Sequence, residues 1–123
     1  MVDTDVLIDY LRDQPEAVAF LESQAHLLAA SVITVAELYV GVRDGEERQR
    51  SDAFVAAFDV LPLTRHAAMC GGLWRRQYGP SHGTGLADAL IAASAQTANA
   101  TLVTLNKRHF PMLERVLVPY IKT

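Results

Sequence analysis

Acidic side chains at the start of the sequence are the first feature that points to chemistry. The segment MVDTDVLIDYLR places Asp3 and Asp5 two positions apart before an apolar run, with Asp9 one helical turn after Asp5. Carboxylates that lie close together repel one another, and each raises the pKa of its neighbour. Either these side chains are solvated groups that cap a helix, or a positive charge lies between them.

Two further carboxylates and one amide occupy similar positions along the chain. Glu37 and Asp88 lie at the predicted starts of helices, and Asn106 follows a predicted strand. The carboxyl ends of parallel strands meet at one edge of a sheet, so these residues and Asp3 are expected to share a site. Helix capping and the helix macrodipole also favour acids at such positions, which leaves a structural explanation open for each residue alone.

A shared acidic site of this kind suits a hard cation. No lysine lies near Asp3, Glu37 or Asp88 in the sequence, so the converging carboxylates have no obvious counter-ion. Mg²⁺ and Mn²⁺ prefer a few carboxylate oxygens plus waters, and they leave positions for phosphate oxygens. We therefore predict that these three acids form a Mg²⁺ or Mn²⁺ site.

The elements that must position these residues alternate between strands and helices. A very short first strand turns directly into a helix, and a capping pattern at Asp13 starts a second helix with Val18, Leu21 and Ala25 on one face. A third helix is expected to open at Thr34 with a capping box closed by Glu37. The other predicted elements are a buried strand at 27–33, a charged turn at 43–52, a helix at 53–58, a strand at 60–63, a helix ending at Gly79, a loop at 79–85, an alanine-rich helix stopping near Asn99, and strands at 101–105 and 116–121.

This alternation predicts an α/β fold, a three-layer α/β/α sandwich with a central parallel sheet. The 123 residues suffice for one core, so residues 1–123 are predicted to form a single domain. Half of the residues are hydrophobic and a fifth are charged, which argues against a disordered or fibrous protein. A lone Cys70 and the lack of any apolar run near ~18 residues predict a soluble, cytoplasmic protein that does not engage membranes.

The charges are divided unevenly along the sequence. Residues 1–60 carry 12 acidic side chains and 4 arginines, whereas residues 61–123 carry 2 acidic side chains and 7 lysines or arginines. An acidic half can gather a cation and a basic half can meet phosphates, although an uneven scatter of solvated charges explains the numbers equally well.

Four segments, in this order and at this spacing, resemble a known family. The segments are VDTDVLIDYLR, ITVAEL, GLADALIAASA and TLVTLNKRHF. Together they resemble the PIN-domain ribonucleases, and specifically the VapC toxins of VapBC toxin–antitoxin systems, over essentially the whole chain. The resemblance implies a compact parallel-sheet fold, a Mg²⁺ or Mn²⁺ cofactor and cleavage of an RNA substrate such as tRNA, rRNA or mRNA. It also implies inhibition by a VapB-type antitoxin that inserts a basic side chain among the acids.

The resemblance assigns roles to individual residues. The family's conserved acids fall on Asp3, Glu37 and Asp88, while Thr4 and Asp5 are expected to support them. Asn106 stands where many members have Asp and His109 where others have a further Asp, so a second metal ion should bind weakly. Cleavage by metal-activated water would leave a 5′-phosphate. The residues expected to contact the RNA backbone are Arg75, Arg76, Lys107 and Arg108.

The resemblance also implies surfaces for protein partners. VapC-like proteins commonly form homodimers, and the apolar positions Ala67, Met69 and Leu73 suit either such an interface or the core. The helical hairpin at 37–58 is the expected antitoxin dock, with Phe54, Val55 and Phe58 as apolar anchors unless they pack within the domain. Trp74 and Tyr78 are candidates to stack on bases, with a core position as the alternative for Trp74.

Two other classes of function remain open from the residues. Asp3-Thr4-Asp5 matches the D-x-D of aspartyl-phosphate phosphatases, but these enzymes also need a downstream lysine and an acidic pair, and no acidic pair follows Lys107. The other alternative is a PIN-like module that binds RNA or protein without catalysis, which the missing fourth acid makes plausible.

Overall fold

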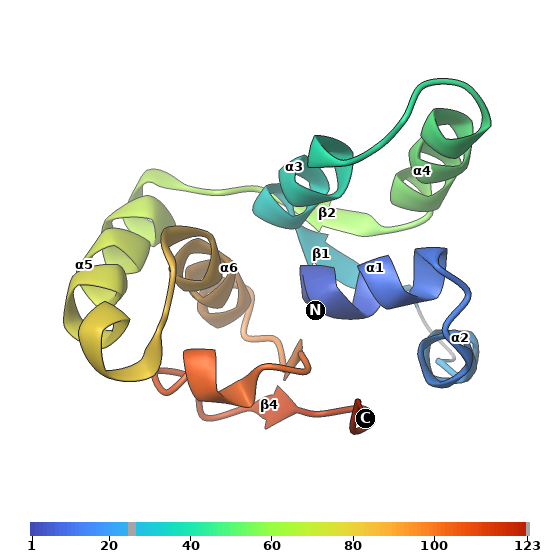
Figure 1. Ribbon diagram of the computed structural model, residues 1–123. Coiled ribbons are helices and arrows are strands. Elements are labelled where there is room, and N and C mark those ends of the chain that lie inside the picture. Colours follow the sequence, from blue (N-terminus) through green and yellow to red (C-terminus); the bar gives the residue numbers. More distant parts are fainter. Residues whose placement is uncertain (25–26, 123) are drawn as a thin grey trace.

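The structure is a computed structural model that describes residues 1–24 and 27–122 (Figure 1). Ala25 of the predicted second-helix face therefore lies outside the described residues. Strands and helices alternate as the sequence predicts, and the helices are longer than the strands. The helices are α1 (Thr4–Leu11), α2 (Pro15–Glu22), α3 (Val32–Val40), α4 (Glu46–Ala56), α5 (Arg65–His82) and α6 (Leu86–Thr97), with a 3₁₀ turn η1 (Lys107–His109).

The strands are all parallel and are joined by the first residues of the chain. Strand β1 (Ala29–Ser31) pairs with β2 (Asp59–Leu61), and β3 (Leu102–Val103) pairs with β4 (Val116–Leu117). The Val2 N–H donates to the Ala29 carbonyl at 2.8 Å, and the Asp3 N–H donates to the Val103 carbonyl at 2.8 Å. Val2 thus lies between the two strand pairs as an isolated bridge residue, where the sequence predicts a very short first strand.

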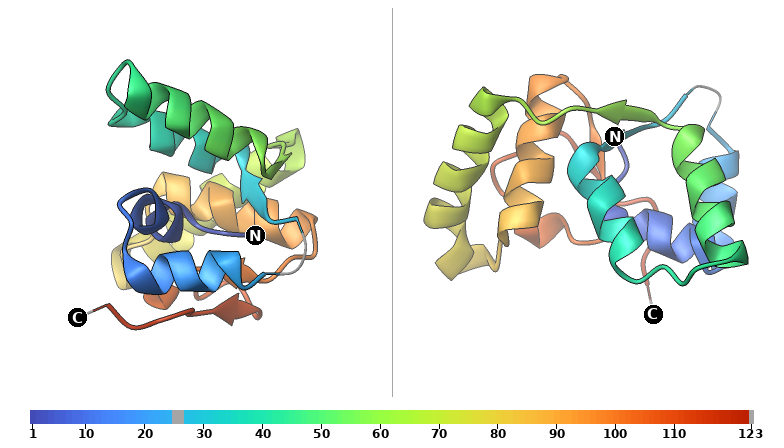
Figure 2. Two further views of the ribbon diagram at one scale, coloured as in Figure 1. Left: turned by 90° about the vertical axis from the view of Figure 1, so that its right-hand side faces the viewer. Right: turned by 90° about the horizontal axis from the view of Figure 1, so that it is seen from above.

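Two hydrophobic clusters lie on opposite faces of this layer. Leu102 belongs to the cluster beneath α6, whereas its neighbour Val103 belongs to the cluster beneath α1 and α3. Adjacent residues of a strand point to opposite faces, so the strands separate the two clusters. Figure 2 shows α5 and α6 side by side at one end of the molecule and α1 to α4 toward the other. The predicted three-layer α/β arrangement is confirmed.

Two predicted helix boundaries are wrong. The segment at 43–52 is not a charged turn, because α4 begins at Glu46. Ion pairs four residues apart, such as Arg48 with Asp52, favour a helix in a sequence with few apolar residues. Helix α3 begins at Val32 after the N-cap Ser31, so Thr34 and Glu37 lie inside the helix and form no capping box.

Other boundaries shift by a few residues. The predicted strand at 27–33 is reduced to β1, and α5 continues past Gly79 to His82, where Gly83 with φ 68° ends it. Asn99, with φ 53°, follows the end of α6 as predicted. Ala67 is buried in the core, whereas Met69 and Leu73 are exposed on α5. None of the helices described in residues 1–24 and 27–122 is long and apolar enough to cross a membrane.

Candidate active site

Asp3 lies where the Val2 bridge turns into α1, and this position fixes its side chain. Asp3 has extended backbone angles and caps the helix, with Oδ1 accepting from the Thr4 N–H at 2.8 Å. Its other oxygen, Oδ2, accepts from the Thr104 hydroxyl at 2.7 Å. The residue is only 5% exposed. Asp3 is therefore a buried carboxylate held in one orientation by two neutral donors.

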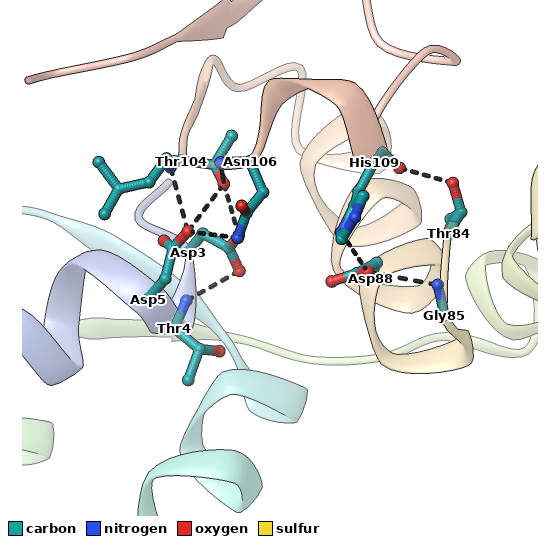
Figure 3. Close-up of polar contacts among 10 residues, drawn as sticks. Asp3, Thr4, Asp5, Thr84, Gly85, Asp88, Thr104, Asn106 and His109 are labelled. Atoms are coloured by element: carbon teal, nitrogen blue, oxygen red, sulfur yellow. Dashed lines mark hydrogen bonds and ion pairs between the residues drawn. The ribbon is translucent and has the colours of Figure 1, made fainter. Parts of the chain in front are cut away.

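Asp5 and Asn106 meet beside Asp3 at the carboxyl end of β3. The Oδ2 atom of Asp5 accepts from the Leu105 N–H at 3.1 Å and from the Asn106 side-chain amide at 3.0 Å (Figure 3). The Thr104 hydroxyl lies 3.4 Å from the same oxygen. The structure thus connects Asn106 to the neighbourhood of Asp3 through Asp5.

Glu37 reaches the site from α3 through Thr4. The Thr4 hydroxyl donates to Glu37 Oε1 at 2.6 Å, and it lies 3.2 Å from the hydroxyl of the buried Thr34. Because Thr4 also donates its N–H to Asp3, one residue contacts both acids. The position of Glu37 in the middle of α3, one turn after Thr34, aims its side chain at the N-terminus of α1.

Asp88 lies in the first turn of α6, opposite the Asp3 group. Its Oδ2 atom accepts from the Gly85 N–H at 3.3 Å and lies 3.3 Å from His109 Nδ1. Figure 3 shows the other oxygen of Asp88 turned toward Asp3 and Asp5. Asp88 also raises the pKa of Asp3, which places the two carboxylates within electrostatic range of each other.

The negative charge of Asp3, Asp5 and Glu37 is not compensated by a nearby cation among the described residues. Burial raises the pKa of Asp3 to about 7, with a further increase from Asp5 and a smaller one from Asp88, against the hydrogen bonds from Thr104 and Thr4. Burial also raises the pKa of Asp5. Among the described residues, no Lys, Arg or His lies within ion-pair distance of Asp3, Asp5 or Glu37.

The donor set fits a hard divalent cation in its chemistry. Carboxylate, hydroxyl and amide oxygens are the ligands that Mg²⁺ and Mn²⁺ prefer, and Asp3 is buried without a cationic partner among the described residues. However, no group of three His, Cys, Asp or Glu side chains within residues 1–24 and 27–122 is close enough to hold a metal ion. Glu37 and Asp88 are engaged by Thr4 and His109 instead, so the predicted three-acid site is not preformed.

The predicted RNA-binding cations lie on two exposed segments. Lys107 and Arg108 belong to η1, directly after Asn106, and both are exposed. Arg75 and Arg76 are exposed on α5, where Gly79 leaves room for the Arg75 guanidinium that a Cβ would block. Trp74 packs against the cluster beneath α6, which confirms the core alternative for that residue.

Sequence reasoning missed Thr104 and underrated His109. Thr104 is fully buried and its hydroxyl donates to Asp3. In the sequence it lies inside the apolar run TLVTL, where a threonine indicates only a strand. The sequence signal that would have identified Thr104 is a hydroxyl near the end of the predicted strand, two residues before Asn106. His109 contacts Asp88, a pairing that its spacing of 21 residues does not predict.

The chain matches known proteins over nearly its full length. The PIN domain family model matches residues 1–115. The chain is 42% identical to ribonuclease VapC10 of Mycobacterium tuberculosis H37Rv, over 98% of this chain and 92% of the relative. It is 37% identical to ribonuclease VapC19 of the same strain, over 98% of both chains. Among solved structures, a toxin–antitoxin complex from Klebsiella pneumoniae superposes with a TM-score of 0.84 at 29% identity, covering 98% of both chains.

These matches agree with the α/β architecture of the chain. The family match covers both Asp3 and Asp88, together with Glu37 between them. The curated relatives extend over the C-terminal segment as well. The chain belongs to the PIN domain family and, within it, to the group that contains the VapC ribonucleases.

Proposed function

We propose that this chain is an endoribonuclease that depends on Mg²⁺ or Mn²⁺ and acts as the toxin of a VapBC-type toxin–antitoxin system. The observation that carries the proposal is the buried Asp3, whose pKa is raised to about 7 and which lacks a cationic partner among the described residues. The relatives that bear the name ribonuclease VapC support RNA as the substrate. Because the substrate would be cellular RNA, we place the protein in the cytoplasm.

The residues of the site have distinct tasks in this proposal. Asp3, Asp88 and Glu37 would hold the cation, and Thr4 and Thr104 fix the orientation of Asp3. A divalent cation bound at such a site supplies charge to the phosphodiester and lowers the pKa of water. Glu37 would orient the attacking water from α3, and Asn106 would hold Asp5 in place. Attack by water rather than by the 2′-hydroxyl leaves a 5′-phosphate and a 3′-hydroxyl.

The exposed cations would bring the RNA backbone to these acids. Arg75, Arg76, Lys107 and Arg108 remain the proposed phosphate contacts, since exposed lysines and arginines supply the non-specific part of nucleic-acid affinity. The exposed Met69 and Leu73 on α5 are available for a homodimer interface. A homodimer would bury these two apolar side chains.

The proposed protein partner is a VapB-type antitoxin, supported by the solved toxin–antitoxin complex of similar fold. A groove of about 600 Å³ runs between α1, α3 and α4, and Glu37 lines it together with Leu38 and Val42. A guanidinium that reached Glu37 from this groove would pair with carboxylates and exclude the cation. Phe54, Val55 and Phe58 are half-buried and pack against the core cluster, in line with the alternative that they pack within the domain, and their role as apolar anchors stays a prediction.

Cleavage of RNA by the purified chain tests this function. We expect cleavage with Mg²⁺ or Mn²⁺, products with 5′-phosphate ends, and no cleavage in excess chelator. Asp3→Asn should reduce the cleavage rate more than about 100-fold. Removing a residue that only orients a metal ligand already costs about 10–100-fold, and the loss of a ligand itself should cost more. Asp44→Asn removes the same charge from a side chain that is 97% exposed and should leave the rate unchanged.

The controls separate the alternatives. RNA binding without cleavage under any divalent metal would favour a binding module. A phosphoenzyme trapped on Asp3 would favour a phosphatase. Equal rates for Asp3→Asn and the wild type would contradict the proposed site.

A further inference from the structure

Asp88 uses its two carboxylate oxygens differently. Oδ2 accepts from the Gly85 N–H and contacts His109 Nδ1, each at 3.3 Å. The other oxygen makes no hydrogen bond to the described residues and is turned toward Asp3 in Figure 3. The imidazole therefore touches the oxygen of Asp88 that faces away from the acidic group.

The backbone of His109 is fixed independently of this contact. Its N–H donates to the Asn106 carbonyl at 2.9 Å, and its carbonyl accepts from the hydroxyl of the buried Thr84 at 2.8 Å. The next residue, Phe110, is buried in the cluster beneath α6. The imidazole thus projects from a turn whose backbone is fixed. The contact with Asp88 therefore restricts only the rotation of the His109 side chain.

The imidazole is not needed to join η1 to the N-terminal end of α6. The Thr84 hydroxyl already ties the His109 carbonyl to the segment that precedes α6. The His109 side chain is 37% exposed, so its removal leaves no buried cavity. What the imidazole adds is a second restraint on the Asp88 carboxylate, whose side chain is 29% exposed and could otherwise rotate toward water.

We propose that His109 is a positioning residue that holds the Asp88 carboxylate in the rotamer that presents its free oxygen to Asp3. The contact is an ion-pair contact at 3.3 Å, and because a lone pair on Nδ1 would repel a carboxylate oxygen, the contact is attractive only with a proton on Nδ1. The nitrogen that faces Gly83 is Nε2, and a Cβ on residue 83 would lie 3.6 Å from it. This inference rests on the proposed metal-dependent function and assigns to His109 control of metal affinity rather than metal ligation.

Calorimetric titration with Mn²⁺ tests the assignment on the full chain. His109→Ala should weaken Mn²⁺ binding about 10- to 100-fold, the usual effect of losing a residue that orients a metal ligand. His109→Asn, whose amide can reach the position of Nδ1, should recover most of the affinity. His109→Gln is the matched control variant. Its amide lies nearer to the position of Nε2, so it should not recover the Mn²⁺ affinity. Equal affinity in all three variants and the wild type would overturn the proposal.

A second readout needs no metal. Nitrogen NMR of the metal-free chain at about pH 8.5, where free imidazole is neutral, should show the His109 proton on Nδ1. Asp88→Asn should shift that proton toward Nε2. The same tautomer distribution in both proteins would contradict the contact.

These outcomes separate this inference from the proposed function. If the wild type binds no Mn²⁺ while the NMR result holds, the metal-dependent function fails and the contact stands. If Asp88→Asn abolishes Mn²⁺ binding while His109→Ala does not weaken it, the function stands and the role of His109 fails.

Discussion

Asp3 and Asp9 are both buried aspartates of the first helical segment, but the groups that donate to their carboxylates differ in charge. Asp9 is 3% exposed and accepts from Lys122 Nζ at 2.8 Å and from the Tyr120 hydroxyl at 2.9 Å. Asp3 is 5% exposed and accepts from a backbone N–H and a threonine hydroxyl, both neutral. Asp9 thus has its cation in the folded chain, whereas Asp3 lacks one among the described residues.

The difference between Asp9 and Asp3 lies in the cost of burying each charge. A buried carboxylate is costly unless it is paired, and the C-terminal tail supplies the partner for Asp9. At Asp3 the neighbouring Asp5 and Asp88 increase the cost, and the pKa is raised to about 7. In the proposed function, this difference between Asp9 and Asp3 among the described residues is the reason for placing the cation at Asp3.

Removing the charge of Asp9 should lower the stability of the folded chain. Asp9→Asn leaves Lys122 without its partner, but the Lys122 side chain is 57% exposed, so its charge returns to water and does not stay buried. We expect a loss of about 1–2 kcal/mol in the free energy of unfolding, measured by urea denaturation, because the buried residue 9 also loses the charge that strengthens its hydrogen bond from the Tyr120 hydroxyl. Asp44→Asn should change it by less than about 0.5 kcal/mol. A neutral outcome for Asp9→Asn would remove the contrast with Asp3.

The pH dependence of stability should report Asp3 directly. Because its pKa is raised from 3.8 to about 7, folded Asp3 keeps a proton that the unfolded chain releases between these values. The metal-free protein should therefore lose stability as pH rises from 4 to 7, by at most about 4 kcal/mol, since one pKa unit equals about 1.4 kcal/mol. Urea denaturation across this range should show a flatter profile for Asp3→Asn. A wild-type profile that rises toward pH 7 would contradict the burial of an unpaired acid.

Adding a carboxylate at Asn106 should have two smaller effects, one on the stability of the metal-free chain and one on Mn²⁺ affinity. Asn106→Asp replaces the amide that donates to Asp5 and so should lower the stability of the metal-free chain. The added charge should tighten Mn²⁺ binding by up to about tenfold, because solvent weakens the attraction at this exposed position. Calorimetry decides this prediction, and weaker Mn²⁺ binding would show that Asn106 does not face the cation.

The sequence predicted the layers because they follow from local patterns of apolar strands and helices. Asp3 stands where the first bridge residue turns into α1, whereas Asp88 stands at the start of α6, which follows helix α5 and not a strand. Glu37 was predicted at the start of its helix but lies inside it, since Ser31 and not Thr34 caps α3. Local patterns do not say which of two good capping residues is used.

The rest depends on contacts between distant residues. Asp9 and Lys122 are 113 positions apart, and their pairing follows from the path of the C-terminal tail rather than from any motif. The first part of helix α4, before residue 53, was missed because ion pairs rather than an apolar face support its first turns. The distinction between paired and unpaired acids, which carries the functional argument, is therefore visible only in the folded chain.

The most direct test of that distinction is the effect of Mn²⁺ on the free energy of unfolding in three proteins. A cation that binds the folded state stabilises it in proportion to RT ln(1 + [L]/Kd), which is about 2.7 kcal/mol at a concentration 100-fold above Kd. We predict this stabilisation for the wild type and for Asp9→Asn, and none for Asp3→Asn. Equal stabilisation of Asp3→Asn and the wild type would show that the buried, unpaired Asp3 is not where the cation binds, and would contradict the account.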